Sequence, residues 1–297
     1  MKARYFIQLV VLSALWGASF MLIRIAVPVL GPNVLAALRI GLASVTLALL
    51  MRLMRHRWPL AHWRELAWLG ALGVALPFLL YAWAGLQLPA GYSALLNTMA
   101  VLFGTFASAW LKEDTLTPRK LLGCLLGFMG VALILRLGPV ALTTGVVLAA
   151  LACVGASACY GISTPLMKRA TTRMQPLEIA MGIHAMAFVV LLPGAIWSLP
   201  QAHFTPGALA AVAVLGVVTS GLAYWMHLRI MRHVTPVAAM SPSFMMPVFG
   251  VAWGHIFLGE PLGAGLFWGG ALVLVASALV SGFNPLSRWL DAVDAKP

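Results

Sequence analysis

The chain has 297 residues, of which 62% are apolar and only 9% charged, and its formal net charge is +12. This composition excludes an ordinary soluble domain, because several apolar runs approach the roughly 20 residues that a helix needs to cross a bilayer. The basic residues lie in short clusters between these runs, which is the positive-inside pattern of membrane proteins and not that of a nucleic-acid surface. No run alternates apolar and polar residues as the strands of a membrane barrel do.

The apolar runs predict an all-α membrane protein with ten transmembrane helices. In chain order they lie at 5–27, 32–52, 66–86, 89–110, 118–136, 144–166, 176–197, 206–229, 235–258 and 263–283. Three helix starts are marked by a capping threonine followed by a proline, at Thr117-Pro118, Thr205-Pro206 and Thr235-Pro236. If the first helix leaves from the cytoplasm, nearly all Lys and Arg residues fall on the inner side. We therefore predict a multi-pass protein of the bacterial inner membrane with both termini cytoplasmic.

The second half of the chain is similar to the first. When the chain is aligned with itself, Trp16-Gly17 falls on Tyr160-Gly161 and Ser19 falls on Ser163. We expect two five-helix repeats, at 1–140 and 141–285, followed by a cytoplasmic tail at 286–297. An odd number of helices in each copy inverts the second copy relative to the first. Inverted repeats build many secondary transporters, with the substrate site near the midplane.

The ninth predicted helix contains Pro242 and Pro247, and each removes a backbone hydrogen bond at about 3 kcal/mol. Such a fault is tolerated in a membrane where the freed carbonyls line a cavity. We predict a kink with a gating role at these two prolines; the alternative is an ordinary proline kink. The equivalent positions of the fourth helix are Leu95 and Ala100, so no counterpart is expected there.

The stretches LWGASF at 15–20 and PNVLAALRIGLASVTLALL at 32–50, with Gly259-Glu260 before a glycine-rich segment, carry a family resemblance. The chain resembles the EamA branch of the drug/metabolite transporter superfamily. Where the second copy has Gly259, the first has Lys112, which departs from the pattern. The resemblance implies a five-plus-five fold whose central cavity is lined by helices 1, 3, 4, 6, 8 and 9. It also implies export of metabolites, with bacterial amino-acid exporters among the known members.

All seven acidic residues lie in loops or at the ends of predicted helices: Glu65, Glu113, Asp114, Glu178, Glu260, Asp291 and Asp294. Proton-coupled exporters of lipophilic cations use a carboxylate within the membrane. The absence of one disfavours cationic drugs and polyamines, and favours neutral, zwitterionic or anionic solutes.

Polar and aromatic residues of the expected cavity helices are the candidate substrate-binding residues. They are Trp16, Ser19, Tyr81, Asn97, Thr98, Tyr160, Ser163, Tyr224, Ser241 and Ser243. An unpaired amide within the membrane is costly, so Asn97 stands out. A hydrogen bond between helices is the alternative for Asn97, aromatic packing for the tyrosines, and bonding to their own helix for the serines.

Arg39 and the histidines His184, His227 and His255 also fall within predicted helices. Arg39 is a candidate acceptor of a substrate carboxylate, or it bonds backbone carbonyls; its helix is not expected to line the cavity. For His184 we expect a neutral structural role. Proton coupling through His227 or His255 is an open alternative.

The sequence thus predicts a secondary transporter that exports small polar metabolites, above all amino acids, by alternating access. We expect no catalytic residues, no metal and no cofactor, and no nucleic-acid partner. The partners are a small-molecule substrate and the lipid bilayer, and the protein is a monomer or a homodimer. Export of other metabolites or drugs, of the multidrug or nucleotide-sugar type, is the alternative; a membrane-embedded enzyme is a more distant one.

Overall fold

The computed structural model describes residues 2–88, 90–135, 143–258 and 264–282, and within these ranges every regular element is a helix. In chain order they are α1 (Ala3–Leu53), η1 (Leu60–His62), α2 (Trp63–Gly70), η2 (Ala71–Ala75), α3 (Leu76–Ala84), α4 (Ala90–Asn97), α5 (Met99–Trp110), α6 (Pro118–Leu135), α7 (Thr144–Ala170), α8 (Pro176–Ser198), η3 (Leu199–Gln201), α9 (Pro206–Ala213), η4 (Val214–Leu222), α10 (Ala223–Met231), α11 (Pro236–Ala239), α12 (Pro242–Leu258) and α13 (Ala264–Ser281).

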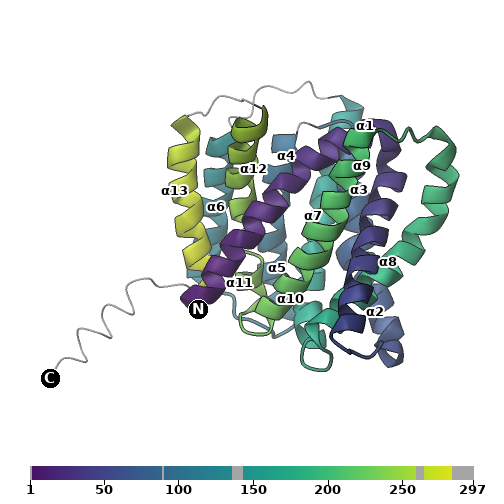
Figure 1. Ribbon diagram of the computed structural model, residues 1–297. Coiled ribbons are helices and arrows are strands. Elements are labelled where there is room, and N and C mark those ends of the chain that lie inside the picture. The colour runs from purple at the N-terminus through teal and green to yellow at the C-terminus, as the bar shows by residue number, and fades with distance from the viewer. Residues whose placement is uncertain (1, 89, 136–142, 259–263, 283–297) are drawn as a thin grey trace.

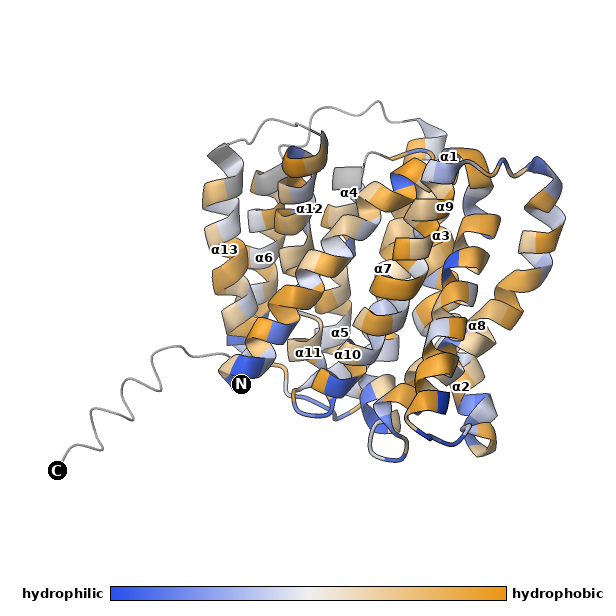
Figure 2. Ribbon diagram, viewed as in Figure 1, coloured by the Kyte–Doolittle hydropathy of each residue, from blue (hydrophilic) through white to orange (hydrophobic). Residues whose placement is uncertain are grey.

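The helices lie side by side as a bundle (Figure 1). Seven helical segments of the described residues are long and apolar enough to cross a membrane: Ala3–Leu53, Leu60–Ala84, Tyr92–Trp110, Thr144–Ala170, Pro176–Gln201, Pro206–Met231 and Pro236–Phe257. Hydrophilic residues gather at the helix ends, above all at the end that carries the N-terminus (Figure 2). The chain is therefore an all-helical, multi-pass membrane protein.

The predicted helix starts are confirmed where threonine precedes proline. α6, α9 and α11 begin at Pro118, Pro206 and Pro236. In each case the threonine hydroxyl before the proline accepts a hydrogen bond from a backbone N–H of the first turn, at 3.3 Å. The threonine cap satisfies one of the backbone N–H groups of the first turn, which have no partner within the helix. Loss of such a cap destabilises the helix start.

α1 contains the first two predicted helices in one run of 51 residues. Its backbone departs from helical geometry at Gly31, where φ is 72° and ψ is 160°. Only glycine adopts a positive φ at little cost, and Pro32 follows at once. The predicted boundary between 27 and 32 thus corresponds to a break without a loop.

Two of the predicted helices are interrupted. The ninth breaks at Met240 and Ser241, between α11 and α12, and α12 continues through Pro247. The interruption therefore lies just before Pro242 and not at Pro247. The fourth breaks at Thr98, between α4 and α5, so the expectation that it has no counterpart is wrong. No proline lies at this break. Instead, the Thr98 hydroxyl donates to Leu95 O at 2.6 Å and competes with the helical hydrogen bonds.

Two stretches wind as π-helix, η2 at Ala71–Ala75 and η4 at Val214–Leu222. π-Helical turns are rare and frequently occur at functional sites. Each lies a few residues before a tyrosine of the cavity described below, Tyr81 in α3 and Tyr224 in α10. These π-helical turns could not be predicted from the sequence, because stretches this short leave no recognisable period in the pattern of apolar residues.

Two glycines next to cavity residues allow close contacts between helices. A Cβ atom on Gly17 of α1 would lie 2.7 Å from Met246 O of α12, and one on Gly161 of α7 would lie 2.7 Å from Gly104 N of α5. These positions accept no larger residue without movement of a neighbouring backbone. They bring α1 against α12 and α7 against α5, and the aromatic residue before each glycine then faces the centre.

Candidate functional site

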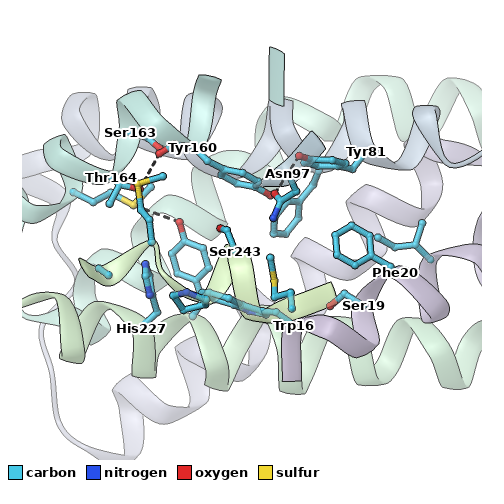
Figure 3. A pocket seen from close by; sticks show the side chains of 18 of the residues that line it. Trp16, Ser19, Phe20, Tyr81, Asn97, Tyr160, Ser163, Thr164, His227 and Ser243 are labelled. Atoms are coloured by element: carbon cyan, nitrogen blue, oxygen red, sulfur yellow. Dashed lines mark hydrogen bonds between the residues drawn. The ribbon is translucent and has the colours of Figure 1, made fainter. Parts of the chain in front are cut away.

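A cavity of about 130 Å³ lies at the centre of the bundle, between α1, α3, α4, α7, α10, α11 and α12 (Figure 3). Most of the predicted binding residues line it: Trp16, Ser19, Tyr81, Asn97, Tyr160, Ser163, Tyr224 and Ser243, together with Pro242. The structure therefore brings together side chains from both ends of the sequence, as the sequence analysis expected of the first, third, fourth, sixth, eighth and ninth helices.

Thr98, Ser241 and Pro247 are not among the residues that line the cavity. Thr98 is buried and its hydroxyl is engaged by Leu95 O. Ser241 is fully buried, and its Oγ has no hydrogen-bond partner among the described residues. Both lie at the helix interruptions, where the side chain is enclosed by the turn.

A polar cluster surrounds the Tyr81 hydroxyl at one side of the cavity. This oxygen lies 3.1 Å from Asn97 Oδ1 and 2.9 Å from Ser157 Oγ, and Ser157 Oγ donates to Leu96 O at 2.9 Å. Asn97 is only 4% exposed, and its Nδ2 atom has no partner among the described residues. The Asn97 amide is thus paired at its oxygen and buried without a partner at its nitrogen among the described residues.

Aromatic rings form much of the same wall. Tyr81 and Tyr160 are stacked with centroids 6.2 Å apart, and the edges of Phe20 and Phe78 meet them at 6.4 and 6.5 Å. Such offset and edge-on pairs stabilise one another and hold the rings in place. The wall is therefore a rigid, apolar surface with hydroxyl groups at its margins.

Trp16 and His227 lie across the cavity from this wall (Figure 3), and the Tyr224 ring meets His227 edge-on at 6.1 Å. Trp16 Nε1 donates to Thr219 O at 2.9 Å, which fixes the indole, and the His227 ring meets it edge-on at 5.1 Å. His227 Nδ1 and Ser19 Oγ have no hydrogen-bond partners among the described residues. Like Asn97 Nδ2, these atoms are buried without a partner, on residues that line the cavity.

Arg39 also reaches the cavity, although its helix was not expected to line it. The expectation was wrong because a long side chain from the second half of α1 extends between neighbouring helices. Its Nε donates to Ser220 Oγ at 2.6 Å and its Nη2 to Thr219 Oγ1 at 3.3 Å. The guanidinium carbon lies 4.1 Å from the centroid of the Phe78 ring. The sequence signal that could have indicated this position is an arginine within an apolar, membrane-spanning segment.

Several further wall residues were not predicted from the sequence: Phe20, Ile23, Phe78, Thr164, Met167, Ala239, Met240 and Met246. Their residue types do not distinguish a cavity wall from a packed core. His184 is fully buried outside the cavity wall, and Ala180 O lies 2.7 Å from its Nδ1, in agreement with a structural role. His255 is exposed on α12.

Polar contacts join neighbouring helices at the bundle end that carries the N-terminus (Figure 1). Lys168 Nζ donates to the carbonyls of Met231 and Arg232 at the end of α10, and Arg169 forms an ion pair with Glu113. Toward the opposite end, a smaller cavity of about 20 Å³ shares Phe20, Ile23 and Tyr81 with the main one. Its further lining includes Arg24 of α1, Gly85 and Leu88 just after α3, and Ser93 of α4.

No Asp or Glu is found among the described residues that line the cavity. Within the described ranges, no group of three His, Cys, Asp or Glu side chains is placed to hold a metal ion. The arrangement can bind a small solute through hydrogen bonds and aromatic contacts, and it offers one positive charge.

Comparison with known proteins identifies the family. The model of the EamA-like transporter family matches the chain twice, at residues 4–136 and 147–282. An uncharacterized transporter of Bacillus subtilis, YvbV, is 26% identical over 291 residues, covering 94% of this chain and 92% of the relative. A probable terminal-alkyne amino-acid exporter of Streptantibioticus cattleyicolor is 25% identical over 270 residues, covering 90% and 89%. A solved structure described only as a protein crystal structure superposes with a TM-score of 0.79 at 18% identity, covering 94% of this chain and 99% of the other. This chain therefore belongs to the EamA-like transporter family, and it is a membrane transporter and not an enzyme.

Proposed function

We propose that the protein is a secondary transporter that exports small polar metabolites, above all amino acids, across the bacterial inner membrane. The observation that carries this proposal is the central cavity, which both matches of the family model help to wall. Its lining combines unsatisfied neutral polar groups with aromatic rings and includes no described acid. That chemistry suits a small polar solute with an apolar part. The relative from Streptantibioticus cattleyicolor, which is named as a probable amino-acid exporter, supports the choice of substrate.

In this proposal the chain crosses the membrane ten times, as two inverted five-helix repeats at 1–140 and 141–285. A helix of 51 residues at about 1.5 Å per residue is more than twice as long as the roughly 30 Å of a bilayer core, so α1 provides two crossings. With α1 counted twice, the seven candidate spans of the described residues make eight crossings. α6 and α13, which pack on one another, bring the number to ten. The two matches of the family model support the repeat. Both termini, including the tail at 286–297 outside the described residues, are then cytoplasmic.

Transport proceeds by alternating access to the central site. The bundle end that carries the N-terminus is closed by Lys168, Arg169 and their partners, while the smaller cavity leads toward the opposite end. The described conformation thus corresponds to a state closed to the cytoplasm. The interruptions at Thr98 and before Pro242 provide the points at which the cavity helices bend between states.

The test is counterflow in proteoliposomes that contain the purified protein, with a panel of labelled amino acids and with or without a pH gradient. We expect counterflow for at least one amino acid, and its loss in Ser243→Trp, which fills the cavity. The matched control is Leu125→Trp on α6, where the native side chain is 58% exposed and faces outward. If no amino acid exchanges, or if Ser243→Trp transports like the control, the proposal fails. Counterflow of nucleotide sugars or drugs alone would favour the alternative substrate classes.

The topology has its own test. A fluorescent protein fused after residue 297 should fluoresce, and alkaline phosphatase fused at the same place should be inactive, because both report on the side of the membrane. The opposite pair of results would show an odd number of crossings or an external N-terminus, and would contradict the proposed topology of ten crossings with both termini cytoplasmic.

A further inference from the structure

Arg39 is the one charged residue among the described residues that line the cavity. A guanidinium stays protonated in proteins, so the wall carries a permanent positive charge. It is only 7% exposed and lies within a helix of the membrane domain. A charge in this position is unfavourable unless it is paired, and intramembrane ionisable residues mark substrate pathways by default.

The contacts of Arg39 orient the side chain without neutralising it. The hydroxyl groups of Ser220 and Thr219 accept hydrogen bonds from Nε and Nη2, and Phe78 stacks on the guanidinium plane. All three partners are uncharged. They hold the planar fork in one orientation, which is the arrangement that binds a carboxylate with two parallel hydrogen bonds.

The acidic residues of the described ranges are engaged elsewhere. Glu65 pairs with Arg173, Glu113 with Arg169 and Asp114 with Lys120, while Glu178 lies 3.4 Å from His56 Nδ1 and caps the start of α8. Each lies in a loop or at a helix end. Within the described part of the chain, therefore, no protein carboxylate compensates Arg39.

We propose that the missing counter-charge is supplied by the solute, and that Arg39 binds its carboxylate. This inference rests on the proposed transport function and narrows its substrate class to monocarboxylates with an aromatic or aliphatic side chain. The carboxylate is the required group, and an amino group is dispensable. An ammonium group would find no acidic partner among the described cavity residues and would be repelled by Arg39.

The rest of the cavity fits such a solute. Phe78 lies between Arg39 and Tyr160, and Tyr160 stacks on Tyr81, so an aromatic surface begins at the guanidinium. A ring or aliphatic chain attached to the carboxylate would extend along this surface. The neutral polar side chains of the wall, among them Ser19, Asn97 and Ser243, can accommodate a polar substituent without a charge.

The first arm of the experiment uses the wild-type protein and three matched probes: phenylalanine, 3-phenylpropionate and phenylalaninamide. Their binding to the purified protein is measured by isothermal titration. We expect 3-phenylpropionate to bind at least as tightly as phenylalanine, and phenylalaninamide, which lacks the carboxylate, to bind about tenfold more weakly or worse. Amide binding equal to that of the acids, or failure of 3-phenylpropionate to bind, would overturn the inference.

The second arm replaces the charge. Arg39→Gln should weaken 3-phenylpropionate binding about tenfold or more, and it should leave phenylalaninamide binding unchanged or tighter because the ammonium group is no longer repelled, so that the preference for a carboxylate is lost. Arg39→Lys should restore part of that preference. Arg119→Gln removes an equal charge from an exposed position of α6 and should keep it. A preference that survives in folded Arg39→Gln would assign Arg39 a structural role, and if this variant does not fold, the wild-type arm still decides.

The inference and the proposed function fail in different ways. Absence of counterflow for every amino acid removes the transport proposal itself. Counterflow that persists together with equal binding of acid and amide removes only the assignment of Arg39.

Discussion

Replacing Gly161 by alanine tests the close packing that shapes the cavity. The added Cβ would lie 2.5 Å from Phe103 Cβ and 2.7 Å from Gly104 N, both in α5. The Gly104 N atom belongs to the backbone, so it cannot be relieved by a change of side-chain rotamer. α7 and α5 must therefore move apart, and Tyr160, which precedes the substituted residue, must move with α7.

The magnitude follows from a comparison with Gly207 of α9, where an added Cβ would meet nothing within 4 Å. Alanine is favoured over glycine in helices by up to about 1 kcal/mol, and this gain is common to both substitutions. The difference in free energy of unfolding between Gly161→Ala and Gly207→Ala therefore isolates the steric cost. Overpacking of this kind costs about 1–3 kcal/mol. For a protein of this size that corresponds to a melting temperature lower by about 2–5 °C.

The assay is thermal unfolding of both variants in the same detergent, followed by counterflow in proteoliposomes. Gly161→Ala should melt below Gly207→Ala and transport more slowly, because the aromatic wall is displaced. Gly17→Ala should behave in the same way, since its Cβ would lie 2.7 Å from Met246 O. If Gly161→Ala melts at or above Gly207→Ala, the contact between α7 and α5 is not as close as described and the reasoning is refuted.

Three further predictions concern polar contacts. Asn97→Ala should slow counterflow without lowering membrane abundance, measured by immunoblot, because it removes from the cavity wall the amide that accepts from the Tyr81 hydroxyl; normal transport would leave Asn97 with a packing role alone. Trp16→Phe loses the hydrogen bond to Thr219 O, and should lower stability by about 1 kcal/mol in a thermal melt, with an unchanged melting temperature as the contrary result. Lys168→Met removes the donor to Met231 O and should make a cysteine probe in the cavity more reactive from the cytoplasmic side; unchanged reactivity would show that Lys168 does not help to close that end.

The sequence by itself determined the class of the protein and the course of its helices. Hydropathy depends on about 20 consecutive residues, so it located the apolar helices without knowledge of their neighbours. The Thr-Pro pairs located three helix starts because a cap and its proline act within one turn. Most candidate binding residues also reached the cavity, since polar and tyrosine side chains within apolar helices are costly to leave facing lipid.

Only the tertiary structure decided which side chains form the cavity wall. Arg39 enters it because its side chain is long enough to pass between helices and is held by Ser220, which lies far away in the sequence. Thr98 is turned away because its hydroxyl bonds to its own helix, and the break there could not be inferred from the prolines of α12. The face that a helix presents to the cavity depends on its rotation and on the close approach at Gly17 and Gly161. Both are set by packing against distant segments, about which local hydropathy carries no information.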